Sequence, residues 1–490
     1  MGSLGELEYN KPHVLVMPYP AQGHINPMLL FAKKLASKQM MVTFVTTEEK
    51  RVRMLQAQDS LPGASNSSME VKFETISDGL PVDFDRSKDV DMVLDLLSKM
   101  GGLTLANLIE RLNAQGNNIS CIVYDSFLHW VPDVAKKFNI PVAFFWTQSC
   151  AVYSIYYNFS GGLANLRDET GKTVDAIEVP GLPLRKVSEL PSFLHPSNTQ
   201  ESLLRLVMDQ FKLLSEATWV LGNSFSELES EEINSMKSLA PIRTVGPLIP
   251  SAFLDGRNPG DTDPGAHLWK TTNCMDWLNT KEPASVVYVS FGSLAVLSKE
   301  QMHEIALGLN ASGYSFLWVV RPPSSKWEIN SEENLPAGFL NETSGQGLVV
   351  PWCHQLQVLS HASIGAFMTH SGWNSTLESL SLGVPMLVIP QWSDQSTNSA
   401  YVAEKWMVGM RLKERSENGL VGREEVEKCI KIVMESQLGA ELRKNALLWK
   451  KLSREAMVKG GSSDRNIQEF VDEVVARAWS SSLSGQDFIV

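Results

Sequence analysis

The sequence predicts an α/β protein made of two doubly wound domains with parallel sheets. A series of apolar strands, Pro/Gly-containing turns and amphipathic helices begins near residue 13, and a second series of the same kind begins near residue 285. A stretch rich in Pro, Gly and Asp, without periodicity, separates the two series. The chain has 490 residues, which is long enough for two or more domains, each with its own core.

The first series opens on HVLVMPYPAQGHINPMLLFAKKLASKQMMVTFVTT. A short apolar strand leads into a Pro/Gly turn, an amphipathic helix is expected from about Asn26, and a β-branched strand follows. This unit implies parallel strands joined by a right-handed crossover. ISCIVYDSF and IPVAFFWTQ predict further buried strands, separated by a helix in VPDVAKKF.

The second series opens on SVVYVSFGSLAVLSKEQMHEIALGLNASGYSFLWVV and continues through LVVPW, IGAFMTH and VPMLVIP before a helical C-terminal part. We expect an N-terminal domain over residues 1–245, a linker over 246–270 and a C-terminal domain over 271–464. Residues 465–490 are expected to form a last helix, packed back on the N-terminal domain, and a frayed tail. Ligands of such folds bind at the carboxyl ends of the strands.

Composition and charge exclude several classes of partner. The net charge is -12, from 43 Lys+Arg and 55 Asp+Glu, whereas nucleic acid and acidic lipid attract basic surfaces. The N-terminus lacks a basic region and has an apolar run of only about five residues, unlike a signal peptide. No stretch approaches the roughly 18 apolar residues of a membrane span. The five scattered cysteines lack C-x-x-C spacing and indicate reduced thiols, so we expect a cytoplasmic protein.

The turn THSGWNST, between an apolar strand and a helix, has two interpretations. In the first, Ser375 is a helix N-cap and Glu378, three residues on, is its capping-box partner. This interpretation leaves His370, Gly372, Trp373 and Asn374 together unexplained. In the second, the free N–H groups of the helix start hold a diphosphate that Gly372 allows to come close and that nearby side chains contact.

Other kinds of site are not supported by the sequence. No G-x-G-x-x-G follows a strand and no G-x-x-x-x-G-K-[ST] occurs, so neither a nicotinamide dinucleotide site nor a P-loop is indicated. A nucleophile elbow centred on Ser371 would need glycines two residues before and after it, and neither is present. The Cys and His residues between 353 and 370 match no usual zinc-ligand spacing, so we expect no metal.

The segment WCHQLQVLSHASIGAFMTHSGWNSTLESLSLGVPMLVIPQWSDQ, residues 352–395, resembles the donor-binding signature of plant family 1 UDP-dependent glycosyltransferases. Further stretches along the chain are similar to other motifs of that family: PYPAQGHINP, YDSF, NSFSELE, VGPLIP and SVVYVSFGS. The resemblance therefore covers nearly the whole chain. It implies two facing Rossmann-like domains of the GT-B type, the N-terminal half taking the acceptor and the C-terminal half the UDP-sugar. Two positions depart from the pattern: Ser371 stands where Cys is common, and His129 stands where Pro is usual.

The resemblance also implies a role for each matching residue of the donor site. The implied contacts are uracil for Trp352 and Cys353, ribose for Gln355 and Glu378, the phosphates for Ser293, His370, Asn374 and Ser375, and the sugar for Thr147, Trp373, Asp394 and Gln395. Structural alternatives remain open at this stage. Trp352 or Trp373 could be a core aromatic residue, and Asp394 could cap a helix.

His24 and Asp125 are the expected catalytic residues. A lone histidine at a helix start is more often a surface or capping residue, but the matching histidine of the family is the general base, oriented by an aspartate matching Asp125. An imidazole can take a proton near neutral pH, and a buried carboxylate fixes its tautomer. The resemblance implies direct displacement that gives a β-glucoside, with UDP-glucose as donor because Gln395 accompanies glucose in the family.

The acceptor is less defined by the sequence. The segments VAFFWTQSCAVYSIYYNF and LPSFLHP supply aromatic and aliphatic side chains suited to a small apolar acceptor such as a terpenoid, steroid or phenolic. We expect a monomer. Two rival functions are a UDP-sugar-binding protein without transfer activity and a nucleotide-sugar epimerase that needs no acceptor.

Overall fold

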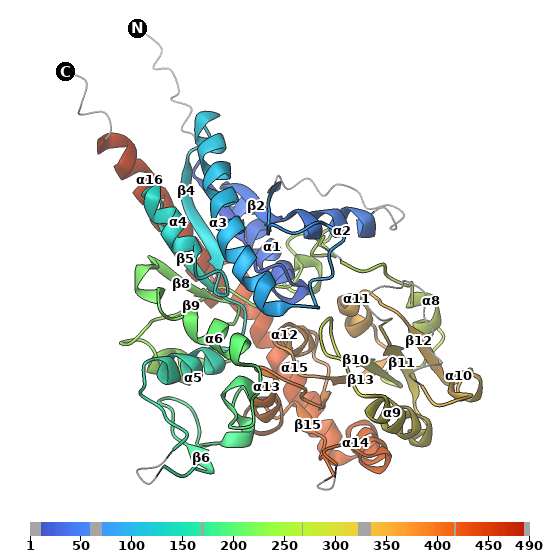
Figure 1. Ribbon diagram of the computed structural model, residues 1–490. Helices are drawn as coiled ribbons and strands as arrows, with labels where there is room; N and C mark the ends of the chain where they lie inside the picture. Colours follow the sequence, from blue (N-terminus) through green and yellow to red (C-terminus); the bar gives the residue numbers. More distant parts are fainter. Residues whose placement is uncertain are drawn as a thin grey trace, which may run out of the picture.

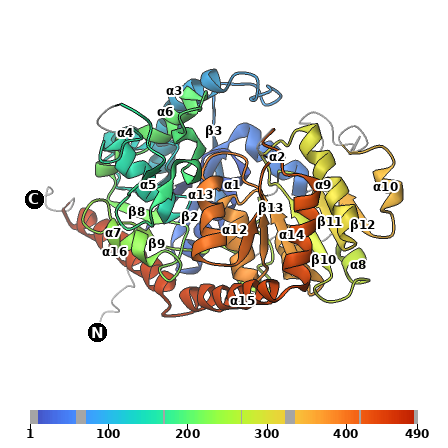
Figure 2. The same cartoon turned by 90° about the horizontal axis from the view of Figure 1, so that it is seen from below.

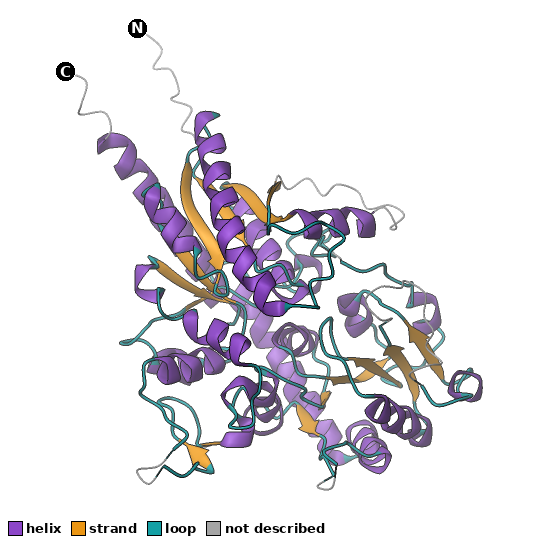
Figure 3. Ribbon diagram, in the orientation of Figure 1, coloured by secondary structure: helices purple, strands orange, loops and turns teal. Residues whose placement is uncertain are grey.

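The computed structural model describes residues 11–58, 71–167, 171–266, 268–321, 335–415 and 418–484. Within these residues the strands form one sheet of seven strands, one of six, and a two-stranded antiparallel ribbon of β6 (Ala176–Ile177) and β7 (Arg185–Lys186). All pairs in the two large sheets are parallel. Helices flank both sheets (Figures 1 and 3), so the predicted fold class of two doubly wound α/β domains is confirmed.

The N-terminal sheet has the strand order β3-β2-β1-β4-β5-β8-β9. The bounds are β1 His13–Met17, β2 Met41–Thr47, β3 Val71–Ile76, β4 Ile119–Asp125, β5 Val142–Trp146, β8 Trp219–Gly222 and β9 Arg243–Thr244. The chain moves outward from β1 through β2 and β3, then returns to pair β4 on the other side of β1. The crevice at this reversal, beyond the carboxyl ends of β1 and β4, is where such folds bind ligands.

Helices cover both faces of the N-terminal sheet. The helices of this half are α1 Gln22–Ser37, α2 Glu48–Gln58, α3 Val90–Ala114, α4 Val131–Lys137, α5 Cys150–Ser160, α6 Glu201–Asp209 and α7 Ser230–Ser235, with short 3₁₀ turns η1 Val187–Glu189, η2 Ser192–Leu194 and η3 Leu214–Glu216. In β1, Val14 and Val16 pack with α1, whereas Leu15 and Met17 pack with α3, α4 and α5. Because both faces are covered, the strands read as continuous apolar runs rather than alternating ones.

The C-terminal sheet repeats this plan in the order β12-β11-β10-β13-β14-β15. The bounds are β10 Val286–Ser290, β11 Ser315–Val319, β12 Gly347–Val350, β13 Ile364–Thr369, β14 Met386–Val388 and β15 Gly409–Arg411. Here the order reverses between β10, which pairs with β11, and β13. The second crevice therefore lies beyond the carboxyl ends of β10 and β13.

The helices of the C-terminal half also lie on both faces of their sheet (Figure 2). Their bounds are α8 Met275–Leu278, α9 Lys299–Ser312, α10 Phe339–Glu342, α11 Gln355–Ser360, α12 Trp373–Leu382, α13 Gln395–Ala400, the π-helical turn η6 Tyr401–Lys405, α14 Arg423–Glu435, α15 Gln437–Met457 and α16 Ser462–Ser484. The 3₁₀ turn η4 Ser251–Phe253 comes between β9 and β10 in the sequence. Helices α9 and α14 cover one face, and α11, α12 and α15 cover the other.

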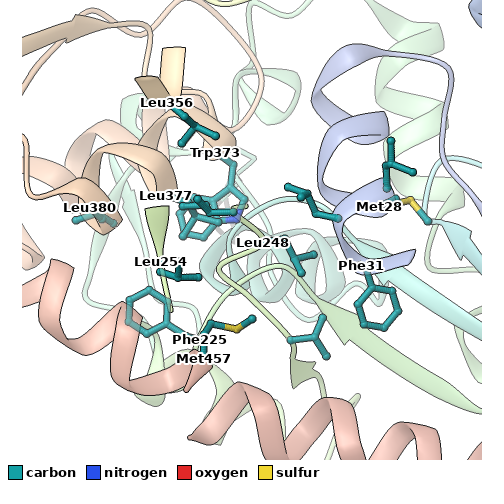
Figure 4. Close-up of a cluster of buried hydrophobic side chains, with 14 of the residues drawn as sticks. Met28, Phe31, Phe225, Leu248, Leu254, Leu356, Trp373, Leu377, Leu380 and Met457 are labelled. Carbon is teal, nitrogen blue, oxygen red and sulfur yellow. The ribbon is translucent and has the colours of Figure 1, made fainter. Parts of the chain in front are cut away.

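The two halves share a hydrophobic core, shown in Figure 4. Phe225, after β8, and Leu248, after β9, lie in one cluster with Trp373 and Leu377 of α12. Helix α16 then crosses back, with Phe470 against Phe31 of α1 at a ring-centroid distance of 6.0 Å. Residues 485–490 of the predicted tail lie outside the described residues. This shared core holds the two strand-end crevices opposite each other.

Two helices differ from the sequence expectation. Helix α1 begins at Gln22 rather than near Asn26, because the backbone N–H groups of His24 and Ile25 already donate to the Ala21 carbonyl. Among the described residues, α3 alone passes a length-and-composition test for a membrane span. That single helix is weak evidence for a span, because core helices pass the same test, and Leu105, Leu108 and Ile109 pack into the N-terminal core.

Candidate functional site

The two crevices meet in one cavity of about 530 Å³. Its lining includes the turn after β1 and the end of β5 from one half, and the turns after β10, β13 and β14 from the other. All but one of the predicted site residues line it: His24, Thr147, Ser293, Trp352, Cys353, Gln355, His370, Trp373, Asn374, Ser375, Glu378, Asp394 and Gln395. Asp125 is fully buried behind His24.

His24 is held by a carboxylate on one ring nitrogen. Its Nδ1 lies 2.7 Å from Oδ2 of Asp125 and 3.2 Å from Oγ1 of Thr147. Because a carboxylate only accepts hydrogen bonds, Nδ1 carries the proton and Nε2 keeps its lone pair. The other oxygen of Asp125 accepts from the Phe127 N–H at 3.0 Å, which fixes the carboxylate. The arrangement leaves a basic nitrogen on a ring whose side chain is 15% exposed.

Two aromatic rings surround the imidazole of His24. The Tyr19 ring lies edge-on at 5.4 Å and the Phe127 ring lies at 4.9 Å, both between centroids. Burial, with a contribution from Asp125, raises the pKa of Tyr19 to about 12, so its phenol stays protonated. Because the two rings cover the imidazole and Asp125 is buried, water has limited access to the His24–Asp125 pair. The low local dielectric strengthens the interaction between the imidazole and the carboxylate.

The turn before α12 does not contain the capping box. The N-cap of α12 is Gly372, without a side-chain cap, and Ser375 lies inside the first turn. The capping interpretation is wrong because both side chains are engaged elsewhere: Gln355 Nε2 donates to Ser375 Oγ at 2.9 Å and to Glu378 Oε2 at 2.6 Å. The first N–H groups of α12 are left without a side-chain cap at the cavity wall, as an anion site requires.

His370 packs between two glycines. A Cβ at Gly292 would lie 2.6 Å from the imidazole, and one at Gly372 would lie 2.5 Å from Nε2. Burial, and secondarily the Arg321 charge, lowers the pKa of His370 to about 4, so the ring is neutral near pH 7. Its Nδ1 lies 3.3 Å from Oγ1 of Thr369. If that hydroxyl donates, Nε2 carries the proton and the ring offers one neutral donor to the cavity.

The predicted ribose contacts form one polar cluster beside α12. Oε1 of Gln355 accepts from the Tyr288 hydroxyl at 3.2 Å, while its amide nitrogen bridges Ser375 and Glu378. Burial raises the pKa of Glu378 to about 7. A diol that entered here would replace the amide at Glu378, so the cluster provides acceptors already oriented for hydroxyl groups.

Trp352 and Cys353 lie at the outer end of this cluster. The half-buried Trp352 ring is 5.9 Å from the Trp269 ring, and the Trp352 carbonyl accepts from Thr272 N at 2.8 Å. The thiol of Cys353 is buried, 3.4 Å from the Tyr288 hydroxyl. Trp352 therefore remains available for stacking from the cavity side, whereas the Cys353 side chain belongs to the core.

Trp373 and Asn374 also bind the other half of the chain. Trp373 is 4% exposed and its indole N–H donates to the Asn223 carbonyl at 2.7 Å, as the core-aromatic alternative anticipates. Asn374 Nδ2 donates to the Gly23 carbonyl at 2.7 Å, next to His24. The helix that opens the proposed diphosphate seat is thus bonded directly to the turn that carries the imidazole.

Asp394 and Gln395 close the opposite side of the cavity. Asp394 occupies the N-cap position of α13, but its carboxylate makes no capping bond and accepts instead from Asn398 Nδ2 at 2.6 Å. Burial raises the pKa of Asp394 to about 6. Gln395 accepts from the N–H groups of Gln391 and Trp392 at 2.9 and 3.2 Å, which fixes the loop before α13.

Comparisons with known proteins agree with this architecture. Residues 247–459 match the family model "UDP-glucoronosyl and UDP-glucosyl transferase", and residues 11–83 match "Glycosyltransferase, N-terminal domain". Gallate 1-beta-glucosyltransferase 84A24 from Punica granatum is 41% identical over 471 residues, covering 95% of this chain and 89% of that protein. Mogroside I-E synthase from Siraitia grosvenorii is 41% identical over 468 residues, covering 95% and 99%. The chain belongs to the plant family 1 UDP-glycosyltransferases.

A solved structure supports the same conclusion for the donor. The crystal structure of Os79 from O. sativa in complex with UDP matches with a TM-score of 0.83 and 34% identity, covering 94% of this chain and 100% of that chain. The protein is therefore a UDP-sugar-dependent glycosyltransferase with the GT-B fold.

The apolar part of the cavity is built mostly from residues that the sequence did not indicate. Of its two aromatic segments, the first supplies core residues such as Phe145, Trp146 and Tyr153, and only Thr147 and Gln148 reach the cavity. Phe193 of the second segment does line it. Further apolar lining residues come from the β1 and β4 turns, α3, α6 and the loop before α13: Tyr19, Val90, Phe127, Leu203, Leu206, Val207 and Trp392.

The two departures from the family pattern lie away from the cavity wall. His129 is not among the described lining residues; burial lowers its pKa, and it faces the charges of Asp209 and Lys212. Ser371 is fully buried in the left-handed region at φ 64°, and its hydroxyl has no partner among the described residues.

No cluster of three or more His, Cys, Asp or Glu that could hold a metal occurs in the described ranges.

Proposed function

We propose that this glycosyltransferase moves glucose from UDP-glucose to a hydroxyl or carboxyl group of a small apolar metabolite, with inversion at the anomeric carbon. The observation that carries the proposal is the pairing of His24 Nδ1 with the buried Asp125 at 2.7 Å. It leaves Nε2 of His24 as a base in the same cavity as the start of α12. A base and an anion seat on opposite domains are what a single displacement between two bound substrates requires.

His24 is proposed to act as the general base. As the acceptor oxygen bonds to the anomeric carbon, its proton passes to Nε2, and Asp125 stabilises the imidazolium that forms. The resulting positive charge lies next to a carboxylate that has no exposure to water. The proton then leaves to solvent when the product departs.

The bond from the anomeric carbon to the diphosphate breaks in the same step. Negative charge grows on the departing UDP, opposite the uncapped start of α12, His370 and the Ser293 turn. Such fixed donors stabilise developing charge without having to reorganise. At neutral pH the lowered pKa of His370 leaves the ring uncharged, and in the tautomer with the proton on Nε2 the ring donates one hydrogen bond to the diphosphate.

The acceptor is proposed to be a flat or polycyclic apolar molecule such as a terpenoid, steroid or phenolic. The apolar wall around Phe127, Phe193 and Leu206 supports this class, because it offers a nonpolar surface beside a single base. Two relatives are named for gallate and for mogroside, which differ greatly in size. Asp394 and Gln395 are proposed to bind hydroxyls of the glucose.

One experiment tests the proposed function directly. The purified protein is incubated with UDP-glucose and a panel of terpenoid, steroid and phenolic acceptors, and products are identified by mass and by the anomeric coupling constant in proton NMR. The proposal predicts UDP release that depends on an acceptor and a β-linked glucoside. An α-linked product would contradict inversion, and conversion of UDP-glucose without an acceptor would favour an epimerase.

Three further properties are proposed and have simple tests. The reaction is metal-independent, so EDTA leaves the rate of glucoside formation unchanged. The protein is a monomer, which light scattering during gel filtration measures. It is cytoplasmic, which a fluorescent fusion at the C-terminus would report in plant cells. A rate that falls with EDTA and recovers with a divalent metal would contradict the first of these.

A further inference from the structure

Arg321 lies immediately beyond the carboxyl end of β11, next to the proposed diphosphate seat. In the C-terminal sheet β11 pairs with β10, and β10 pairs with β13. Three neighbouring strands therefore deliver Arg321, the Ser293 turn and His370 to the same edge of the sheet. Arg321 itself does not line the cavity.

The guanidinium of Arg321 binds the turn after β10 at two carbonyls. Nη1 donates to the Ser293 carbonyl at 2.6 Å, and Nη2 donates to the Ala295 carbonyl. Both residues line the cavity. Arg321 forms no ion pair with any described residue, so its charge is not neutralised by a carboxylate in the described parts of the chain.

The turn that Arg321 holds is in tight contact with His370. Gly292 has φ +70° and leaves no room for a Cβ against the imidazole. A shift of this turn would move both the Ser293 hydroxyl and the surface on which His370 packs. Two backbone hydrogen bonds from one planar side chain restrict such a shift.

The cavity needs a source of positive charge for a diphosphate. No lysine or arginine is among the described residues that line it, and His370 is neutral near pH 7. The partial positive charge at the N-terminus of α12 is then the remaining positive charge that the described wall offers to a diphosphate. The half-buried guanidinium of Arg321, which has no ion pair to any described residue, lies one layer behind the wall and acts through a medium that screens poorly.

We propose that Arg321 is a positioning residue for the departing diphosphate, fixing the turn at residues 293–295 and adding a positive charge behind the seat. This inference rests on the proposed function, because it assumes that the diphosphate docks at the start of α12. A group that acts on the diphosphate favours the transition state over the bound donor. Replacing Arg321 therefore lowers kcat as well as raising KM for UDP-glucose.

The experiment compares UDP with uridine by isothermal titration calorimetry on the native chain, Arg321→Met and Arg321→Lys. Uridine lacks the diphosphate, so it reports on the uracil and ribose contacts alone. We expect Arg321→Met to weaken UDP binding about tenfold to a hundredfold and to leave uridine binding unchanged. Arg321→Lys keeps the positive charge but cannot bind both carbonyls in the same geometry. Its affinity for UDP is expected to lie between that of the native chain and that of Arg321→Met.

Arg443→Met is the matched control. The Arg443 guanidinium also bridges two carbonyls, of Gly365 and Val433, but far along β13 from the cavity. We expect this variant to keep the native ratio of UDP to uridine affinity.

Two results would overturn the inference: an equal loss of UDP and uridine affinity in the Arg321 variants, or no loss of UDP affinity. If Arg321→Met does not fold, Arg321→Lys is judged by the same affinity ratio. Failure of the native chain itself to bind UDP would instead contradict the donor seat.

Discussion

Removing the His24 imidazole should separate chemistry from donor binding. In His24→Ala the acceptor loses its base, and general-base catalysis contributes about 10²–10⁴-fold. At about 1.4 kcal/mol per factor of ten, this corresponds to roughly 3–6 kcal/mol of transition-state stabilisation. The hydrogen-bond partners of the imidazole among the described residues are Asp125 and Thr147, both in the N-terminal half. UDP affinity should therefore stay at the native value.

The assay is initial-rate glucoside formation with saturating UDP-glucose, together with UDP titration calorimetry on the same preparation. Loss of the imidazole leaves the Phe127 N–H as the remaining donor to the buried Asp125 carboxylate among the described residues, so the melting temperature is measured alongside. A double variant, His24→Ala with Asp125→Asn, should be no slower than His24→Ala, because Asp125 acts through the ring. Native turnover in His24→Ala, or a matching loss of UDP affinity, would refute the reasoning.

Four further changes test separate parts of the site. Asp125→Asn alone should reduce kcat about tenfold to a hundredfold, less than His24→Ala, as initial rates would show. Burial raises the pKa of Glu378 from 4.5 to about 7, so between these pH values the folded protein holds a proton that the unfolded chain releases. The ligand-free protein should therefore lose stability as pH rises from 4.5 to 7, and Glu378→Gln should reduce the pH dependence of the melting temperature over that range. Ser371→Cys should stabilise the fold by about 1 kcal/mol in urea unfolding, because a buried hydroxyl without a partner is costly. Phe193→Ala should raise KM for a polycyclic acceptor several-fold without changing UDP affinity, and an unchanged KM would remove Phe193 from the acceptor wall.

The sequence predicted the parts of the molecule that depend on local pattern. Apolar runs and Gly/Pro turns indicated the strands and helices of both domains, and the order of strands in β/α folds then places their carboxyl ends together. Gly372 and the polar residues around it suggested an anion seat in the turn before α12, as the alternative to a capping box, and the anion seat stays a prediction. The specific roles of His24 and Asp125, however, came from family resemblance and not from spacing.

What the sequence did not reveal depends on contacts between distant segments. Gln355 and Ser375 are 20 residues apart, and only the fold shows that their bond replaces the capping box. The apolar part of the cavity wall draws on α6, whose Leu203 and Leu206 share one helical face but carry no motif. Arg321 follows an ordinary apolar strand, so no local pattern indicates that it binds the neighbouring turn.

A crystal structure of the protein with UDP tests the central claim most directly. We predict that the β-phosphate lies within hydrogen-bond distance of the first N–H groups of α12 and of Ser293. His24 Nε2 should face the part of the cavity next to the β-phosphate, where the glucose of the donor would lie. A diphosphate bound elsewhere in the cavity, or an imidazole turned away from that space, would contradict the account.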